Sequence, residues 1–287
     1  MAGKAPIAII GPGNLGSALA VALKRAGYMI EIVISRPKPS SLKRARALAR
    51  EVGADLTRDL RVSNARVVWF CVPDSQIAKV SSQMARNLPS SKGLIALHSS
   101  GALTSDELRD LRRKGAQAAS VHPLMTFVVG SRPPLSGVPF AVEGDDGAVR
   151  MARQIVNDLR AHSYRIRKSD KAAYHAWGTF ASPLLTSLLV TAERVAALAR
   201  IPKDKAKERI IPIALQTIAN YAQSENSKAF SGPIIRGDVA TVRQHLAVLR
   251  RMSPARDVYL ALARSALEDL PAKNKSTMRR MLRSAGA

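Results

Sequence analysis

Three histidines and one lysine of this chain are the side chains best suited to handle a proton during catalysis. His98 and His122 each follow a short apolar run, while Lys171 and His175 lie one helical turn apart farther along the chain. Histidine and lysine commonly donate to an oxygen on which negative charge develops. These four residues are therefore the candidate catalytic residues. Each also has a structural alternative: a structural histidine for His98, a residue that fixes the His-Pro turn for His122, a solvent-facing residue for Lys171 and a core residue for His175.

A glycine-rich segment indicates the cofactor that would accompany them. Gly11-Pro12-Gly13-Asn14-Leu15-Gly16 directly follows the apolar run 6–10 and opens an amphipathic helix over 15–26. In such a strand–turn–helix unit the first glycine allows a tight turn, the second lets the backbone approach a diphosphate, and the third lets helix and strand pack closely. The N–H groups at the helix N-terminus then bind the negative charge. We therefore predict that a dinucleotide is bound by Gly11, Gly13, Asn14, Leu15 and Gly16.

The residues after the second expected strand, at 29–34, indicate the type of dinucleotide. An NAD enzyme usually has an Asp or Glu here, which binds the ribose hydroxyls. This chain has Ser35-Arg36 instead, and it has no Asp or Glu between residues 32 and 50. A phosphate on the ribose would be attracted by the nearby side chains of Arg36, Lys38, Lys43 and Arg44. The pattern favours NADP over NAD, with Ser35 and Arg36 at the ribose; the alternative is that Arg36 is an ordinary surface residue.

Two further segments follow expected strands and would lie at the same cleft. Cys71-Val72-Pro73 ends an apolar run, so we expect its backbone to pass beside the cofactor. Cys71 itself fits a packed thiol better than a nucleophile, because it lies in an apolar strand with no histidine near it in sequence. Ser99 and Ser100 follow His98, and we predict that Ser99 contacts the cofactor and that Ser100 contacts the substrate.

The elements that must position these residues alternate between strands and helices over the first part of the chain. This alternation is typical of an α/β fold with a Rossmann-type, doubly wound and mostly parallel sheet. We place the dinucleotide-binding domain at residues 1–168 and a helical domain for substrate binding and dimerisation at 169–287. The expected strands are 6–10, 29–34, 67–72, 94–98, 118–121, 139–142 and a short one near 165–167.

The second domain is expected to be all-helical, because strand signals stop after Ser169. Its first helix is predicted from Asp170 to Arg200, with the stretch 172–192, which has no charged side chain, as a buried length rather than a membrane span. Farther on, Arg236 lies in a glycine-containing loop where it could bind a substrate carboxylate or phosphate. The alternative is a purely structural turn in which Asp238 caps the next helix.

Composition excludes several classes of protein. The chain has 287 residues, 46% hydrophobic and 23% charged, which excludes a disordered or low-complexity protein. One cysteine excludes an internal disulfide, and the histidines are too scattered to predict a metal site. The net charge of +24 is spread along the chain, so it favours small anionic ligands over nucleic acid. A cytoplasmic location is expected, since the N-terminus has no export signal.

Several segments together resemble a family of two-domain proteins with an N-terminal Rossmann-like domain and a C-terminal helical domain of unknown function, usually described as oxidoreductases. These segments are GPGNLGSALA, CVPDSQI, HSSGAL, SVHPLMTF, GVPFAVEGD, AYHAWGTFAS and SGPIIRGDVATVRQHL. The wider superfamily includes pyrroline-5-carboxylate reductase and the hydroxyisobutyrate, ketopantoate and prephenate dehydrogenases. Resemblance to the prephenate enzymes points to His122, and a looser resemblance to hydroxyacid dehydrogenases points to Lys171.

The chain also departs from these patterns. Ser182 is followed by Pro183 where the family often has asparagine, and the asparagine that follows the catalytic lysine of hydroxyacid dehydrogenases is missing. The expected function is an NADP-dependent oxidoreductase acting on a small anionic carbonyl, hydroxy or imino acid, assembled as a homodimer through its helical domain. The alternative is a dinucleotide-binding sensor or scaffold without catalysis.

Overall fold

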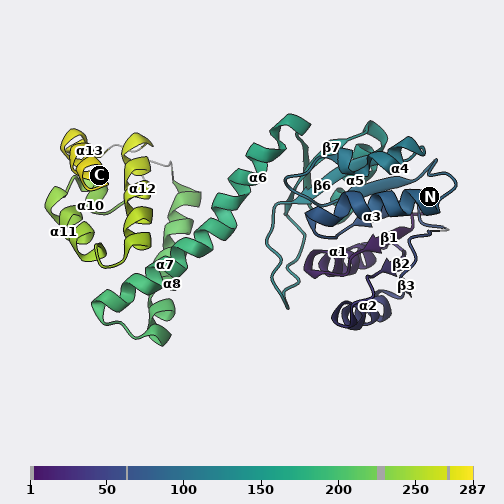
Figure 1. The fold of residues 1–287 in the computed structure, drawn as a ribbon, viewed down its shortest axis with the longest axis horizontal. Helices are drawn as coiled ribbons and strands as arrows, with labels where there is room; N and C mark the ends of the chain where they lie inside the picture. The colour runs from purple at the N-terminus through teal and green to yellow at the C-terminus, as the bar shows by residue number, and fades with distance from the viewer. Residues whose placement is uncertain (1–2, 63, 225–229, 270–271, 287) are drawn as a thin grey trace. The chain divides into compact units, whose positions relative to one another are not determined.

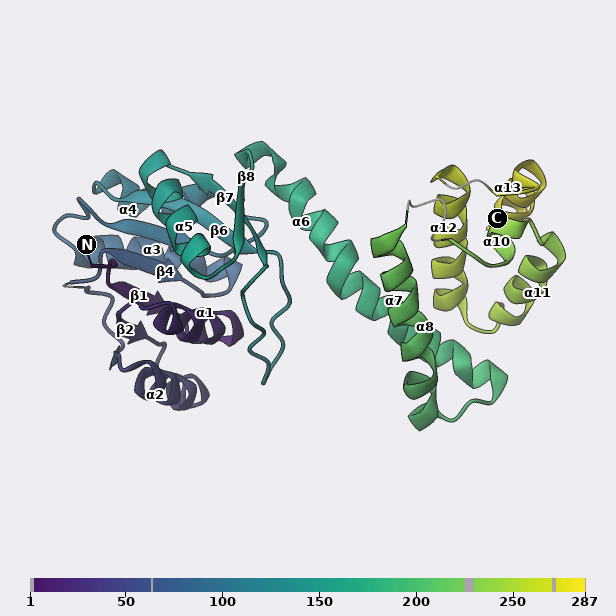
Figure 2. The same cartoon turned by 180° about the vertical axis from the view of Figure 1, so that it is seen from behind.

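The computed structural model describes residues 3–62, 64–224, 230–269 and 272–286. It divides into two compact units, residues 1–179 and 180–287 (Figures 1 and 2). The boundary falls inside a long helical run. As a result α6 (Lys171–Thr179), which carries two of the candidate catalytic residues, belongs to the N-terminal unit together with the sheet.

The N-terminal unit is built on one eight-stranded sheet with the order β3-β2-β1-β4-β5-β6-β7-β8. Neighbouring strands are parallel except β6 and β7, which confirms the mostly parallel α/β fold. β3 was not expected, because three residues are too few to make an apolar run. The strands are β1 Ile7–Ile10, β2 Ile30–Ile34, β3 Asp55–Thr57, β4 Val67–Phe70, β5 Ile95–His98, β6 Gln117–Pro123, β7 Pro139–Gly144 and β8 His162–Arg165.

Helices cover both faces of this sheet. Apolar side chains of α1 (Asn14–Arg25), α2 (Pro39–Val52) and α5 (Asp146–Asp158) form one core with one face of the strands. The other face packs against α3 (Asp74–Asn87) and the short segment made of η1 (Ser105–Leu108) and α4 (Arg109–Arg113). The central strands are therefore buried on both sides, which explains their continuous apolar runs.

The strand register brings the candidate residues to one edge of the sheet. Ile10 pairs with Phe70, Phe70 with His98, and His98 with Ser120 across four neighbouring parallel strands. The segments that follow these four residues therefore leave the sheet side by side. This carboxyl edge is where open α/β sheets bind their ligands.

The second unit is helical, and its core is made by α11 (Val239–Leu249), α12 (Ser253–Asp269) and α13 (Lys275–Ser284). The unit begins within the helical run, which continues from α6 through a π-helical turn that contains Pro183. The other elements are η3 Phe180–Leu184, α7 Leu185–Ala196, η4 Ala197–Ala199, α8 Lys203–Gln223 and α10 Pro233–Arg236, with η2 Lys168–Asp170 preceding α6 in the first unit.

The long helix differs from expectation in its surroundings. The run Lys168–Ala199 is long and apolar enough to cross a membrane by length and composition, and 0% of its most apolar window is buried within the described chain. The prediction that residues 172–192 form a buried length is therefore wrong. An apolar helix surface must pack against another surface to be shielded from water. The sequence of the helix does not tell whether that surface belongs to the same chain.

Candidate functional site

The glycine turn between β1 and α1 has three glycines in three different situations. Gly11 has φ +96°, and a Cβ atom there would lie 2.7 Å from the carbonyl oxygen of Cys71. A Cβ on Gly16 would collide with the carbonyl oxygen of Gly11. At Gly13, by contrast, an added Cβ would meet nothing within 4 Å. Gly11 and Gly16 are thus required by the fold, whereas Gly13 faces open space at the N-terminus of α1, where backbone can approach a ligand.

A cavity of about 520 Å³ opens at this turn. Among the residues predicted to bind the cofactor, its lining includes Gly11, Gly13, Asn14, Ser35, Arg36, Cys71, Val72 and Pro73. Leu15, Gly16 and Ser99 are not part of the lining. Gly16 instead packs against the backbone of Gly11, which is the helix–strand contact expected for the third glycine of the motif.

The charged residues in the lining of this cavity are all basic. Arg36, Arg44 and Arg58 line it, and its lining contains no Asp or Glu side chain. Arg36 is held in place by α2, because its Nε donates to the hydroxyl oxygen of Ser41 at 3.1 Å. Arg58 follows β3, so it was missed together with that strand. A cluster of guanidinium groups without a carboxylate suits a phosphate rather than ribose hydroxyls.

Cys71 and Asn14 complete the cavity in structural roles. Burial raises the pKa of the Cys71 thiol to about 12, so the thiol is not ionised near neutral pH and is a packed side chain. The side chain of Asn14 donates through Nδ2 to the carbonyl oxygen of Phe127 at 3.1 Å. Asn14 therefore fixes the segment between β6 and β7 against the start of α1.

His98 is held entirely by the protein. Its side chain is fully buried, Nε2 lies 3.0 Å from the carbonyl oxygen of Thr104, and Nδ1 accepts from the N–H of Ser100 at 3.1 Å. Burial lowers its pKa to about 4, and the charges of Lys171 and His122 act in the same direction. A neutral ring with both nitrogens bonded to backbone shapes the loop after β5 and has no free atom for a substrate.

The two serines after His98 are also engaged within the protein. Ser99 accepts a hydrogen bond from the indole N–H of Trp69 at 2.8 Å. Ser100 is buried, and its hydroxyl donates to Asp74 Oδ2 at 2.7 Å and accepts from the N–H of Leu103 at 2.9 Å. These contacts place the loop that leads into Gly101.

Lys171 is buried at the sheet edge, with 1% of its surface exposed, so the solvent-facing alternative is wrong. Its ammonium donates to the carbonyl oxygen of Ser100 at 2.8 Å and to the hydroxyl of Ser120. Burial lowers its pKa to about 8, although the charges of Glu143 and Asp74 oppose this shift. The first turn of α6 is thus attached to the loop after β5 and to β6 through one cation.

His122 lies beside Tyr174 and His175 of the same helix. Its Nδ1 is 2.7 Å from the phenol oxygen of Tyr174, and its ring centroid is 6.2 Å from that of His175. Burial lowers the pKa of His122 to about 4, with smaller contributions from Lys171 and His175. His175 is exposed. A Cβ on Gly101 would lie 2.9 Å from His122 Nε2, so this glycine gives the ring its room.

The structure therefore brings His122, Lys171 and His175 together and adds Tyr174, which sequence reasoning missed. Tyr174 lies three residues after Lys171, so the shared helix face was the available signal. Arg236 lies in the second unit, at the end of α10. It is exposed and forms an ion pair with Asp238, Nε to Oδ2 2.9 Å, while Asp238 makes no side-chain cap bond to α11. The role of Arg236 in substrate binding stays a prediction.

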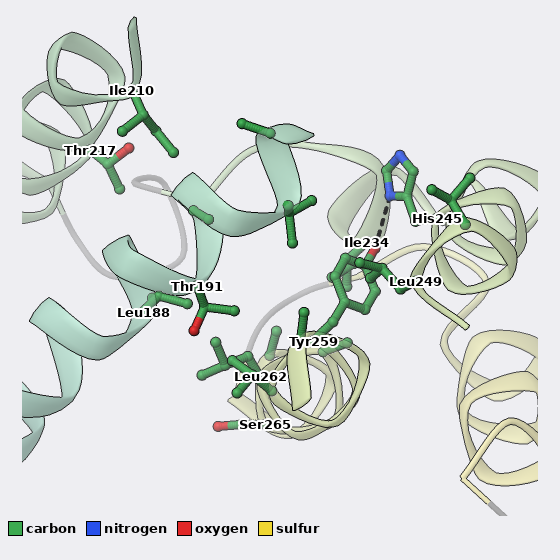
Figure 3. Close-up of a pocket in the computed structure, with 18 of the residues that line it drawn as sticks. Leu188, Thr191, Ile210, Thr217, Ile234, His245, Leu249, Tyr259, Leu262 and Ser265 are labelled. Carbon is green, nitrogen blue, oxygen red and sulfur yellow. Dashed lines mark hydrogen bonds between the residues drawn. The ribbon is translucent and has the colours of Figure 1, made fainter. Parts of the chain in front are cut away.

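A second cavity, of about 1250 Å³, lies within the helical unit (Figure 3). Its lining is mostly apolar and includes Leu188, Ile210, Leu249 and Leu262. A hydrogen bond of 3.1 Å between His245 Nδ1 and the Tyr259 hydroxyl lies at its edge, drawn as a dashed line in Figure 3. None of the predicted site residues lines this cavity.

Two family models match the chain. Residues 2–123 match a Rossmann-like domain, and residues 138–266 match a domain of unknown function, DUF2520. The chain thus joins a Rossmann-like domain to a DUF2520 domain. This confirms the resemblance drawn from its motifs. No curated protein matches the chain.

Several solved structures share the fold of this chain at low sequence identity. A protein of Bacteroides fragilis assigned as an NADP oxidoreductase is 24% identical, with a TM-score of 0.75 over 91% of this chain and 97% of that one. Protein TM1727 of Thermotoga maritima is 22% identical, with a TM-score of 0.70 over 98% and 100%. A reductive aminase of Aspergillus terreus in complex with NADPH is 15% identical, with a TM-score of 0.64 over 96% and 98%.

Proposed function

We propose that the protein is an NADP-dependent oxidoreductase that transfers a hydride between nicotinamide and a small anionic carbonyl, hydroxy or imino acid. The observation that carries this proposal is the glycine turn, open at Gly13, at the head of a cavity that has three arginines and no carboxylate in its lining. The shared fold supports it, since solved structures of this fold include a reductive aminase in complex with NADPH and a pyrroline carboxylate reductase with NADP bound.

The residues of the turn and the arginines of the cavity lining would hold the two charged parts of the cofactor. Backbone N–H groups in the first turn of α1, directly after Gly13, bind the diphosphate, because they are unpaired in the helix and lie at its positive end, whereas the N–H of Gly13 itself donates to the carbonyl oxygen of Gly11 at 2.8 Å. Arg36, Arg44 and Arg58 bind the 2′-phosphate. When bound, the cofactor supplies the hydride through C4 of the nicotinamide.

His122 is the residue we assign to the reacting atoms of the substrate. Its pKa of about 4 makes the ring neutral at pH 7, so it acts as a neutral hydrogen-bond donor rather than as an imidazolium. A donor beside the oxygen or nitrogen that gains charge stabilises the transition state. His175 is exposed and its ring lies 6.2 Å from that of His122, so we assign it an assisting role.

Lys171 and His98 act on the site without contacting the substrate. Both are buried and bonded within the protein. Lys171 contributes positive charge beside His122, and His98 fixes the loop after β5. Ser100 likewise acts by placing Gly101 next to the His122 ring. An anionic substrate is favoured by the net charge of +24, and Arg236 is the residue of the helical unit that we assign to its carboxylate.

We infer that the helical unit pairs with a second copy to form a homodimer in the cytoplasm. Large apolar side chains of α8 are exposed, including Ile213 at 66%, Leu215 at 61% and Tyr221 at 63%. Exposed apolar patches of this kind mark contact surfaces. The same helix carries a charged first half, so a protein partner suits it better than lipid. In a symmetric dimer, the apolar surface of α8 on one copy packs against the same surface on the other copy, so both are buried by one contact.

Light scattering after size exclusion tests the dimer. We expect the wild-type chain to elute with twice the mass of one chain and the double variant Ile213→Glu, Leu215→Glu to elute as a monomer. A matched control is Lys205→Glu, a charged residue at the start of the same helix. A monomeric wild-type protein contradicts the dimer, and a protein that requires detergent contradicts the cytoplasmic location.

Binding and turnover together test the enzymatic function. We expect NADPH to bind more tightly than NADH, by roughly tenfold or more, and to be oxidised in the presence of one member of a panel of 2-oxo acids and cyclic imino acids. His122→Asn is expected to keep the NADPH affinity and to lose turnover. NADPH binding with no turnover on the whole panel supports the sensor or scaffold instead, and absence of binding to either nucleotide overturns both.

A further inference from the structure

We propose that Tyr174 is a positioning residue that fixes the proton of His122 on Nε2, so that this nitrogen donates a hydrogen bond toward the substrate. The proposal rests on the role assigned to His122 above. It makes the first turns of α6 part of the reaction machinery, because they carry the group that decides which ring nitrogen holds the proton.

The contact between the two side chains is short and enclosed. The phenol oxygen of Tyr174 lies 2.7 Å from His122 Nδ1, and the rings meet edge to face with centroids 5.5 Å apart. Tyr174 is 9% exposed. Tyr164 of β8 packs on its other side with a ring-centroid distance of 6.3 Å, and the Tyr164 hydroxyl has no hydrogen-bond partner among the described residues.

Among the described residues, His122 Nδ1 is the one hydrogen-bond partner of the Tyr174 hydroxyl, and the Tyr164 hydroxyl lies close enough to help raise the Tyr174 pKa without making a hydrogen bond of normal geometry. If the proton of His122 were on Nδ1, the phenol would have to accept it, and its own O–H could turn only toward the Tyr164 hydroxyl, which makes no hydrogen bond of normal geometry among the described residues. With the proton on Nε2, the phenol donates to the lone pair of Nδ1, so the Tyr174 hydroxyl and Nδ1 are both satisfied by this contact. The arrangement therefore selects the tautomer that is protonated on Nε2.

The protonation states of the surrounding groups agree with this assignment. Burial raises the pKa of Tyr174 far above its ordinary value, so the phenol keeps the proton that it donates. The titratable groups around His122 are Lys171 and His175 on α6 and His98 on β5, and Lys171 and His175 both disfavour a second proton on its ring. His122 is therefore a neutral ring with one proton to place.

The position of Nε2 is consistent with a donor that faces a ligand. Gly101 lies close to it, since a Cβ there would be 2.9 Å from Nε2 and 2.5 Å from His175 Cδ2. Nε2 has no hydrogen-bond partner within the described residues, in contrast to both nitrogens of His98. An N–H at this point can donate a hydrogen bond to a carbonyl oxygen during reduction. Oxidation of a hydroxyl would need the opposite tautomer, with a lone pair on Nε2.

Nitrogen NMR of histidine-labelled protein tests the tautomer without any turnover. We expect the His122 signals of the wild type, assigned with His122→Asn, to show a protonated Nε2 and an unprotonated Nδ1. Tyr174→Phe keeps the ring and removes the hydroxyl, so we expect a mixture of both tautomers. The matched control is Tyr164→Phe, which removes a hydroxyl that makes no hydrogen bond to the described residues. A proton on Nδ1 in the wild type, or an unchanged ratio in Tyr174→Phe, overturns the proposal.

Kinetics separates this proposal from the proposed function. If a substrate is reduced, we expect Tyr174→Phe to lower kcat by about tenfold while the Kd for NADPH and the thermal midpoint stay at wild-type values. The same loss of kcat in Tyr164→Phe overturns the specific role of Tyr174. If the tautomer shifts as expected but no protein turns over any substrate, the proposed function fails while the assignment of the proton on His122 stands.

Discussion

The ammonium of Lys171 hydrogen-bonds to the hydroxyl of Ser120, two residues before His122 on the same strand. The same ammonium donates to the carbonyl oxygen of Ser100 at 2.8 Å, so one buried cation connects α6, β6 and the loop after β5. A charge held at this place acts on the neighbouring imidazole as well as on the fold. This double effect can be separated by experiment.

Replacing Lys171 by methionine should raise the pKa of His122. The change keeps an unbranched side chain and removes the positive charge that contributes to the pKa of about 4. Burial and His175 remain, so the pKa should move upward without reaching the ordinary value of 6.5. A proton NMR titration measures this change, with Lys168→Met as the control because Lys168 is exposed and paired with Asp106. An unchanged pKa of His122 would show that the Lys171 charge does not reach the ring.

Acid should destabilise the protein before its carboxylates titrate. His98 and His122 each have a pKa of about 4 in the folded chain and 6.5 as the ordinary value, so between these limits the unfolded chain binds more protons. The free energy of unfolding therefore falls as pH drops through this window, by up to about 3 kcal/mol for each histidine. Urea denaturation at several pH values measures the slope.

His122→Gln should reduce that slope, because it removes one of the two depressed groups. His162→Gln is the matched control, since His162 is exposed in β8. Equal slopes in the wild type and His122→Gln would contradict the depressed pKa of His122.

Two glycines of the turn should respond in opposite ways to alanine. Gly13→Ala places a Cβ in open space, so we expect wild-type stability and a loss of NADPH affinity of roughly tenfold or more, because the methyl occupies the approach of the diphosphate. Gly16→Ala places a Cβ against the carbonyl oxygen of Gly11, so we expect a loss of stability of about 1–3 kcal/mol. Thermal unfolding and NADPH titration of both variants decide the matter, and wild-type affinity in Gly13→Ala would argue against a diphosphate at this turn.

The arginines of the cavity should discriminate between the two pyridine nucleotides. Arg36→Ala and Arg58→Ala each remove a cation from the cavity lining, so we expect NADPH affinity to fall by about tenfold in each while NADH affinity is little changed. Arg46→Ala is the control, because Arg46 is an exposed residue of α2 outside the lining. Calorimetric titration with both nucleotides measures the affinities. Equal losses for NADPH and NADH would place the arginines away from the 2′-phosphate.

Short-range patterns were enough to find most of the sheet and the dinucleotide turn. A strand that is buried on both faces needs a continuous apolar run, and a glycine with positive φ is required by local sterics, so both leave a mark within a few residues. β3 has no such apolar run, so neither this strand nor Arg58, which follows it, was predicted. The sequence by itself therefore establishes the α/β class, the glycine turn and the lack of any Asp or Glu between residues 32 and 50.

The environment of the candidate site depends on contacts between segments that are far apart in the chain. From the sequence, Lys171 could be either solvent-facing or buried, and its burial follows from the packing of α6 against β6 and the loop after β5. The role of Tyr174 depends on its distance of 2.7 Å from His122, which lies 52 residues away in the chain. The same holds for the long apolar helix, whose most apolar window is not buried by the described residues. Burial and hydrogen bonding are properties of neighbours in space, and periodicity along one helix cannot name the neighbour.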